Sequence, residues 1–363
     1  MTEFNIKKFL KYTLSFILFY KILNYFRNTF LKPVFYDIFF SNERKAVCII
    51  APYYSFAGAK KLTCVCDFQG LKIILEPSIV DDSDRNCLIV LFKLPSNVSG
   101  RFIYEIMNRR LRISVGEGIF MESSNRKYKV SISTLFKYEI PFLKEWIDHH
   151  LSIGVEHFYL YENNYLADKN ISDILDPYIK KGLITHILWP FPYNFYNYKV
   201  KKLWPNDSYS YTQISQINHA IYKFGDESEW ILNCDVDEYF YSPRKQNILD
   251  VVNTLSQNGD IASIRISGIW FGGTREETAR VRKDGVKKTF IYSEERPTAN
   301  FKCIFNTESV MVASVHNSLS QVKKEINVSF DLFRFNHYRG LGWKRRVDED
   351  FAHNVKNTEI LFS

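Results

Sequence analysis

The sequence contains no two cysteines at the Cys-x-x-Cys spacing, although there are six cysteines among its 363 residues. This absence argues against a zinc knuckle and against a thioredoxin-like redox site. Four of the cysteines lie in the first quarter of the chain, where one disulfide could form, but we expect buried free thiols instead. There is also no long run of Lys or Arg and no recognisable nucleic-acid-binding motif. The net charge of +8 therefore indicates no nucleic-acid partner, and suits phosphate-bearing ligands or an anionic membrane surface.

The N-terminal segment lacks an apolar stretch long enough to cross a membrane. Lys11, Lys21 and Arg27 interrupt it, and its longest uncharged piece is far shorter than the roughly 20 residues that a spanning helix needs. It also lacks the small-residue cleavage site of a signal peptide. We predict an amphipathic, membrane-associated helix within residues 1–40, with a helix packed on the protein's own core as the alternative. The absence of a clean spanning helix favours the cytoplasmic face of a bacterial inner membrane over a Golgi lumen.

What the sequence does contain is the composition of a globular protein, with 46% apolar and 24% charged residues. Residues 45–122 hold short runs rich in Val, Ile and Leu, separated by Gly, Asp, Ser and Pro, which predict a small β-rich domain. The helical candidate in this region is one turn or two over residues 102–110, FIYEIMNRR. The polar stretch 121–127, MESSNRK, marks the boundary with the next domain.

From residue 128 to residue 350 the pattern changes to strands that alternate with helices. The expected strands cover residues 129–136, 155–162, 183–189, 229–236 and 261–271. The expected helices cover residues 141–154, 171–182, 211–225 and 247–257. This alternation predicts an α/β domain with a mainly parallel central sheet and helices on both faces. The basic stretch 280–288 is expected to be a solvated hairpin tip, and residues 351–363 a C-terminal tail.

Three carboxylates follow one of these strands in WILNCDVDEYF, namely Asp235, Asp237 and Glu238. An acidic surface turn without a function usually also contains Gly, Pro, Ser or Asn, whereas Val236 and Tyr239 are among the neighbours of the acids here. In sheets of this kind, ligands bind outside the carboxyl ends of the strands. Two carboxylates at that edge can share a magnesium or manganese ion, and both ions also bind phosphate oxygens. The sequence therefore predicts a metal and phosphate site.

An ordered set of motifs resembles glycosyltransferase family 92, whose catalytic domain has the Rossmann-like, nucleotide-sugar-binding GT-A fold. The stretches that carry the resemblance are KYEIPFLKEWIDHHLSIGVEHFYLYENN, QISQINHAIYKF, WILNCDVDEYF, WFGG and FNHYRGLGWKRR. They cover residues 128–350. The chain departs from the family's pattern at YENN, where Glu162 stands in place of the first residue of an Asp-Asn pair. This departure puts the details of the contact with the nucleotide base in doubt.

The resemblance implies a metal-dependent hexosyltransferase that inverts the anomeric centre. The donor would be a nucleotide-diphosphate sugar, with UDP-galactose as the family-based choice, and the acceptor a glycan or lipid-linked saccharide. The cofactor would be Mn²⁺ or Mg²⁺, because the leaving diphosphate develops negative charge that a metal neutralises. The resemblance implies Asp237 as a direct ligand and Asp235 toward the ribose or the metal's water. A third ligand late in the chain would be His337, in preference to His316; a histidine hydrogen-bonded in the interior is the alternative.

Further site residues follow from the same resemblance. Glu139, Glu162 and Asn163 lie at predicted strand ends, where the nucleoside should bind, although Glu139 also suits the start of a helix. Inversion needs a carboxylate base for the acceptor hydroxyl. We favour Glu276 and Glu277 because they follow a strand end directly. The competing carboxylates are the acidic residues Asp348, Glu349 and Asp350.

Two functions of other classes remain open from the sequence. The chain could be a non-catalytic carbohydrate-binding protein on a transferase scaffold, but the intact DVDE motif argues against decay. It could also be a nucleotidyltransferase, which pairs acids on a similar sheet. Such enzymes usually carry a Gly-rich, basic phosphate loop after the first strand, and LFKYEIP contains no such loop.

Overall fold

The computed structural model describes a set of ranges that ends at residue 362 and leaves out the first 34 residues. The described residues are 35–52, 56–80, 87–109, 111–121, 126–137, 139–164, 171–191, 211–257, 261–316, 318–319, 324–339, 341, 353 and 355–362. The predicted membrane-surface helix falls mainly in residues 1–34, outside the described residues, as do Asp348, Glu349 and Asp350. No helix among the described residues is long and apolar enough to span a membrane.

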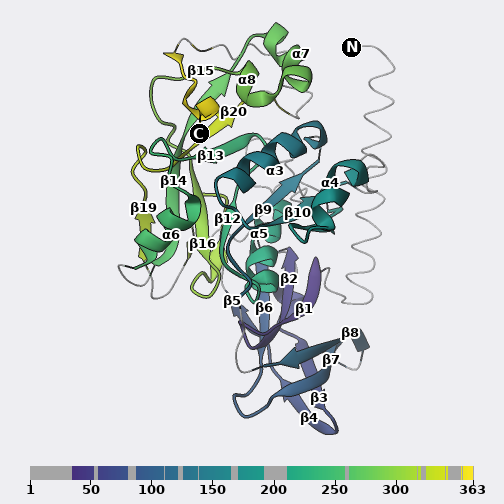
Figure 1. The fold of residues 1–363 in the computed structure, drawn as a ribbon. Coiled ribbons are helices and arrows are strands. Elements are labelled where there is room, and N and C mark those ends of the chain that lie inside the picture. The colour runs from purple at the N-terminus through teal and green to yellow at the C-terminus, as the bar shows by residue number, and fades with distance from the viewer. Residues whose placement is uncertain are drawn as a thin grey trace, which may run out of the picture. The chain divides into compact units, whose positions relative to one another are not determined.

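The smaller of two compact units is made from residues within 35–120 and consists of two four-stranded sheets. One sheet has the order β1-β2-β6-β5 and the other β4-β3-β7-β8 (Figure 1). Their bounds are β1 (Asp37–Ser41), β2 (Ala46–Pro52), β3 (Leu62–Phe68), β4 (Leu71–Leu75), β5 (Ser78–Val80), β6 (Cys87–Lys93), β7 (Gly100–Asn108) and β8 (Leu111–Phe120), with a short helix α2 (Phe56–Ala59). Strand β1 lies within the stretch assigned above to the N-terminal segment.

The helical turn expected over residues 102–110 does not form, because this stretch belongs mostly to strand β7. Phe102, Tyr104 and Ile106 are buried in the core of the unit, while Ile103 between them is exposed. Burial of alternate residues is the period of a strand rather than of a helix. The helical candidate over residues 102–110 was therefore wrong.

The larger unit is built on an eleven-stranded sheet with the order β11-β10-β9-β12-β16-β14-β15-β21 (Figure 1). Strands β19 and β20 also pair with β14, and β13 pairs with β20. The bounds are β9 (Tyr128–Phe136), β10 (His157–Glu162), β11 (Ile184–Leu188), β12 (Ser228–Asn233), β13 (Glu238–Tyr241), β14 (Ile261–Gly272), β15 (Tyr292–Ser293), β16 (Phe301–Asn306), β19 (Lys324–Asn327), β20 (Arg334–Tyr338) and β21 (Val355–Lys356); β17 (Val312–Ala313) and β18 (Ser318–Leu319) form a separate ribbon.

The predicted α/β class is confirmed, but the sheet is mixed rather than mainly parallel. Strands β11, β10, β9 and β12 are parallel neighbours, as the alternating sequence pattern predicts. Strand β16 then runs antiparallel to both β12 and β14. The sequence analysis did not identify a strand at residues 301–306. Its insertion separates β12 from β14 and changes the second half of the sheet.

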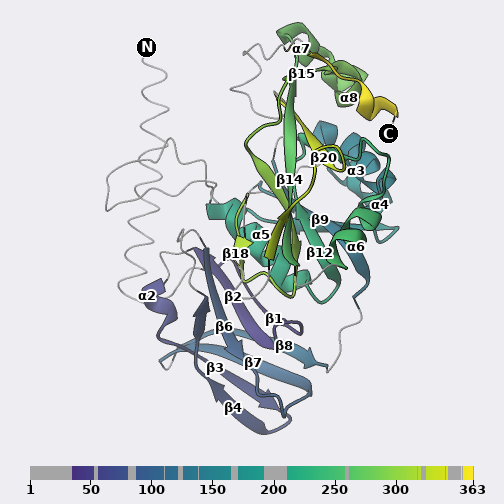
Figure 2. The ribbon, with the colours of Figure 1, turned by 90° about the vertical axis from the view of Figure 1, so that its left-hand side faces the viewer.

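Helices cover both faces of the parallel strands, as predicted. Helix α5 (Tyr211–Phe224) lies on one face, and α3 (Leu143–Ser152), α4 (Ile171–Ile179) and α6 (Ile248–Ser256) lie on the other (Figure 2). A short 3-10 helix, η2 (Ile140–Phe142), precedes α3 and contains the proline that was expected to open it. Gly154 and Gly182 follow α3 and α4 with positive φ angles of 98° and 72°, so they terminate these helices as a C-terminal glycine does.

The C-terminal part of the unit differs from two expectations. The basic stretch 280–288 is helical, within α7 (Arg275–Asp284) and α8 (Val286–Thr289), and is not a hairpin tip. The expected tail contributes β21, which pairs with β15, and η3 (Glu359–Phe362), whose Ile360 is buried in the core. As predicted, all six cysteines are free and buried.

Candidate functional site

The acidic motif lies on a turn between β12 and β13 rather than on a continuing strand. Strand β12 ends at Asn233, and the Glu238 N–H donates to the Asp235 carbonyl over 3.0 Å. The Asp235 N–H in turn donates to Glu238 Oε2 over 2.9 Å, so a second hydrogen bond, to the side chain of Glu238, stabilises the turn. The turn gives Asp235 and Asp237 different surroundings, and it places Glu238 at the start of a new strand.

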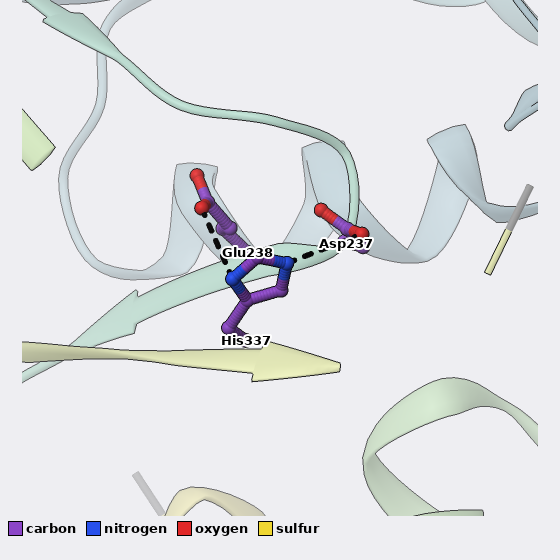
Figure 3. Close-up of side chains that lie close together, drawn as sticks. All are labelled: Asp237, Glu238 and His337. Carbon is purple, nitrogen blue, oxygen red and sulfur yellow. Dashed lines mark ion pairs between the residues drawn. The ribbon is translucent and has the colours of Figure 1, made fainter. Parts of the chain in front are cut away.

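Asp237, Glu238 and His337 form the one cluster of potential metal ligands found among the described residues, and we call it the metal-type cluster. In the antiparallel register of β13 and β20, Glu238 lies opposite His337. His337 Nε2 is 3.4 Å from Asp237 Oδ2, and His337 Nδ1 is 3.4 Å from Glu238 Oε1 (Figure 3). One ligand atom from each residue lies within 4.8 Å of the others. Two carboxylates and one imidazole fit Mn²⁺ or Mg²⁺, which favour hard oxygen ligands and, for Mn²⁺, accept nitrogen.

The ring of His337 is supported from behind by Trp270 on β14. The two ring centroids are 3.9 Å apart with an interplanar angle of 28°. Strands β14 and β20 are parallel, and their register puts Trp270 beside His337. The Arg339 guanidinium lies 3.9 Å from the centroid of the Trp270 ring. Trp270 is therefore engaged by two side chains of the protein, one of which belongs to the metal-type cluster.

Asp235 contacts a buried lysine and a glutamine. Lys302 Nζ lies 2.7 Å from Asp235 Oδ2 and 2.9 Å from Glu238 Oε2, and Gln213 Nε2 donates to Asp235 Oδ1 over 2.9 Å. Burial acts to raise the pKa of Asp235, but the charge and hydrogen bond of Lys302 outweigh it, and the pKa is lowered. Burial raises the pKa of Glu238 to about 7, against the effect of Lys302. Asp235 is thus held ionised, whereas Glu238 titrates near neutral pH.

Side chains of helix α3 bond the backbone of β13 on the side away from β20. The Trp146 indole N–H donates to the Glu238 carbonyl over 3.0 Å. His150 Nε2 accepts the Phe240 N–H over 3.3 Å, and His149 Nε2 lies 2.7 Å from the Phe240 carbonyl oxygen, to which its N–H donates. Burial lowers the pKa of His149 to about 3 and that of His150 well below its ordinary value, so both rings are neutral. Helix α3 therefore fixes the strand that carries Glu238.

The residues predicted to meet the nucleoside lie at the carboxyl ends of β9 and β10. Glu162 ends β10 and is fully buried, with Asn164 donating to its Oε1 over 2.9 Å and His186 Nε2 3.1 Å from its Oε2. Asn163 donates from Nδ2 to the carbonyls of Trp189 and Phe191, at 2.8 Å each. Glu139 Oε2 accepts the Lys137 N–H over 2.9 Å, next to the start of η2.

The two carboxylates predicted to act as base have different environments. Glu277 forms a capping box with Thr274 at the start of α7: Thr274 N–H donates to Glu277 Oε2 over 2.8 Å, and Glu277 N–H donates to Thr274 Oγ1 over 3.2 Å. Glu276 is exposed in the same turn and takes no part in this cap. The structure thus gives Glu277 a local role at the helix start.

His316 has a backbone partner and lies outside the metal-type cluster. Its Nδ1 lies 2.6 Å from the Phe301 carbonyl oxygen, which accepts its hydrogen. Burial lowers the pKa of His316. Among the described residues, the cluster of potential ligands includes His337 and not His316.

Sequence reasoning missed four polar residues of this region: Glu238 as a ligand candidate, Lys302, Gln213 and His186. Glu238 was visible in the acidic motif, but no feature of the sequence indicated that a new strand begins at Glu238 and pairs it with His337. Gln213 stands in a quoted motif, at the start of the helix before the acids. No pattern in the sequence marks Lys302, which lies 67 residues from Asp235.

Metal affinity at the cluster is expected to fall as the pH falls through about 7. Burial raises the pKa of Glu238 to about 7, and Asp237 outweighs burial to raise that of His337. A cation must displace these protons, so its affinity rises with pH. Titration of the protein with Mn²⁺ at several pH values between about 6 and about 8 measures how the affinity for Mn²⁺ changes with pH. An affinity that does not change over this range would exclude both groups as ligands.

The fold and the cluster define a class of protein: an α/β protein with an acidic, histidine-containing group of potential cation ligands beside the carboxyl ends of its parallel strands. Residues 126–362 match the family model described as Glycosyltransferase family 92. The chain belongs to glycosyltransferase family 92, as its motifs predicted.

Curated relatives carry the same family name at low identity. A rice (Oryza sativa subsp. japonica) protein named glycosyltransferase family 92 protein Os08g0121900 is 24% identical over 224 residues, which is 60% of this chain and 34% of the relative. The Ricinus communis protein RCOM_0530710, also named for family 92, is 24% identical over 314 residues, 79% of this chain and 52% of the relative. The galactan β-1,4-galactosyltransferase GALS3 of Arabidopsis thaliana is 24% identical over 211 residues, 56% and 39% of the two chains. The chain thus spans about half or less of the length of these relatives.

Solved structures are similar only to a slight degree. A Mycobacterium tuberculosis glucosyl-3-phosphoglycerate synthase, solved with Mn²⁺, UDP and glucosyl-3-phosphoglycerate, has a TM-score of 0.26 and 11% identity, covering 50% of this chain and 57% of that one. The WbbM bifunctional glycosyltransferase has a TM-score of 0.27 and 7% identity, covering 53% and 34%.

Proposed function

We propose that this chain is a metal-dependent glycosyltransferase with a GT-A-type catalytic domain, which transfers a hexose from a UDP-sugar to a glycan or lipid-linked acceptor with inversion. The observation that carries the proposal is the cluster of Asp237, Glu238 and His337 beside the carboxyl ends of the parallel strands. Family membership supports the reaction class. Two relatives are named galactan β-1,4-galactosyltransferases, which supports galactose as the first sugar to test.

Asp237, Glu238 and His337 would hold Mn²⁺ or Mg²⁺. A bound ion supplies positive charge against the diphosphate that leaves the anomeric carbon. Helix α3 holds the backbone of Glu238 and Trp270 packs on the ring of His337 before any ligand binds, which is the pre-organisation that such stabilisation needs. Asp235, held ionised by Lys302 and Gln213, is proposed to face the ribose or a metal-bound water.

Glu139, Glu162 and Asn163 are proposed to lie along the nucleoside. Glu162 and Asn163 directly follow each other at the carboxyl end of β10, next to β9 in the sheet. The contact between Glu162 and His186 fixes the carboxylate that replaces the family's Asp. The proposal for Glu162 rests on its place at the carboxyl end of β10, next to β9, and not on an open carboxylate oxygen.

We propose Glu276 as the catalytic base, because Glu277 is engaged in the capping box. Glu276→Gln is expected to lower turnover by about 100-fold, within the range of general-base catalysis, with unchanged thermal stability. Glu277→Ala is expected to cost about 1 kcal/mol of unfolding free energy through loss of the cap. Measuring turnover and melting temperature for both variants separates the catalytic role of Glu276 from the structural role of Glu277. If Glu277→Gln, which retains the cap, abolishes turnover and Glu276→Gln does not, the base is Glu277.

The direct test of the proposed function is a panel of nucleotide sugars with Mn²⁺, analysed by mass spectrometry for hydrolysis and for transfer to saccharide acceptors. Turnover of one donor that stops when the metal is chelated supports the proposal. Binding of saccharides without turnover of any donor would favour a non-catalytic carbohydrate-binding protein. Release of pyrophosphate from a nucleoside triphosphate and a sugar phosphate would favour a nucleotidyltransferase.

We further propose that the protein works at a membrane surface, with the cytoplasmic face of a bacterial inner membrane as the first choice and a Golgi lumen as the alternative. The support is the sequence of residues 1–32, which mixes aromatic and aliphatic residues with Lys and Arg. Deleting residues 1–32 is expected to release the protein from liposomes that contain anionic lipid, with activity on a soluble acceptor retained. A full-length chain that already floats free of such liposomes contradicts this proposal.

A further inference from the structure

Lys302 is a buried cation that takes no direct part in the proposed reaction. It is the second residue of β16, and its side chain is 3% exposed. Its ammonium lies 2.7 Å from Asp235 Oδ2 and 2.9 Å from Glu238 Oε2. A buried lysine needs anionic partners, and here both partners belong to the acidic motif.

Glu238 lies between this lysine and the metal-type cluster. Its Oε2 contacts Lys302 over 2.9 Å, and its Oε1 is 3.4 Å from His337 Nδ1. The acidic motif is thereby divided into two parts. On one side, Asp235 and one oxygen of Glu238 surround an ammonium; on the other side, Asp237 and the second oxygen of Glu238 face an imidazole.

The charges of the motif balance with one ammonium and one divalent ion. Asp235, Asp237 and Glu238 carry three negative charges when ionised. Lys302 supplies one positive charge and a divalent cation two, while a neutral His337 supplies none. A second divalent ion would leave excess positive charge beside the buried side chains of Glu238 and Lys302, which the low dielectric of an interior disfavours.

We propose that Lys302 is a positioning residue that acts as a permanent cation of the site, so that the acidic motif binds a single divalent ion on the side of Asp237, Glu238 and His337. This inference rests on the proposed metal-dependent function. It implies that Lys302 keeps Asp235 away from the ion, and that removing the lysine opens the Asp235 side to a second ion.

The experiment counts Mn²⁺ bound to the full chain, from the electron paramagnetic resonance signal of free Mn²⁺, in the wild type and in three variants. Lys302→Met removes the ammonium, Lys302→Arg retains the charge, and Lys324→Met removes an exposed lysine of the same unit as a control. The wild type, Lys302→Arg and Lys324→Met are expected to bind one ion. Lys302→Met is expected to bind two ions, or one ion at least about 10-fold more tightly, because a positive charge near the site is lost.

The same number of ions with the same affinity in Lys302→Met and Lys324→Met would overturn the inference and leave the proposed function standing. A wild type that binds no ion, with Lys302→Met binding one, would support Lys302 as the cation and overturn the metal-dependent function. If Lys302→Met does not fold, the double variant Lys302→Met with Asp235→Asn removes both charges of the pair. That variant is expected to fold without added metal and to bind one ion, and binding of two ions to it would overturn the inference.

Discussion

Asp237→Asn is expected to reduce sugar transfer by at least about 100-fold, since loss of an outer-shell partner alone costs up to about that much. The amide keeps the size of the side chain but loses the negative charge that a divalent ion needs. Metal-dependent donor binding should fall with turnover. The side chain of Asp237 is 21% exposed and lies on a turn, so the melting temperature should change little. Turnover at saturating donor, with Mn²⁺ present, is the measurement.

The matched control for this variant is Asp331→Asn, which changes an exposed aspartate in a turn of the same unit. It should leave turnover and metal requirement as in the wild type. Unchanged turnover in Asp237→Asn would contradict the proposed metal site, whatever the outcome of the other variants.

His337→Ala is expected to weaken Mn²⁺ binding by at least about 10- to 100-fold without abolishing it, because both carboxylates of the cluster remain. Excess Mn²⁺ should therefore restore part of the activity of this variant, whereas Asp237→Asn should stay inactive. The measurement is activity as a function of Mn²⁺ concentration, with the melting temperature recorded in parallel.

His316→Ala is the comparison that separates the two histidines. Its ring bonds the Phe301 carbonyl, so its loss should lower stability and leave the Mn²⁺ requirement unchanged. A shift of the Mn²⁺ curve in His316→Ala alone would assign the third ligand to His316. A shift in neither variant would mean that the site has no histidine ligand.

The order of elements in the parallel half of the sheet could be predicted from the sequence. Two of its helices have apolar stripes that end at Gly154 or Gly182, and its strands contain continuous apolar runs such as WIL, because they are covered on both faces. These signals are local, so each can be read within about 15 residues. The antiparallel strand β16 contains the apolar run CIF, but no local feature of the sequence indicates the direction of this strand or its neighbours in the sheet.

The residues of the candidate site were predicted partly from one motif and partly from a resemblance. Asp235 and Asp237 were identified from their position after an apolar strand, and His337 from a resemblance. The turn at residues 234–237, which divides the acids between two environments, depends on a hydrogen bond from Asp235 to the side chain of Glu238. The pairing of Asp235 with Lys302 depends on the antiparallel contact of β12 and β16. The second contact arises only once the chain has folded, because Asp235 and Lys302 are 67 residues apart in the sequence.

The bonds from helix α3 to β13 also bear on the behaviour of the protein in solution. Among the described strands, β13 pairs with β20 alone, which would leave a row of open backbone groups along its other side. Exposed rows of this kind recruit strands from other molecules and promote aggregation. Here an indole and two neutral imidazoles already occupy the carbonyl of Glu238 and both polar groups of Phe240. This edge of the sheet, next to the acidic motif, therefore cannot pair at these groups with a strand from another molecule.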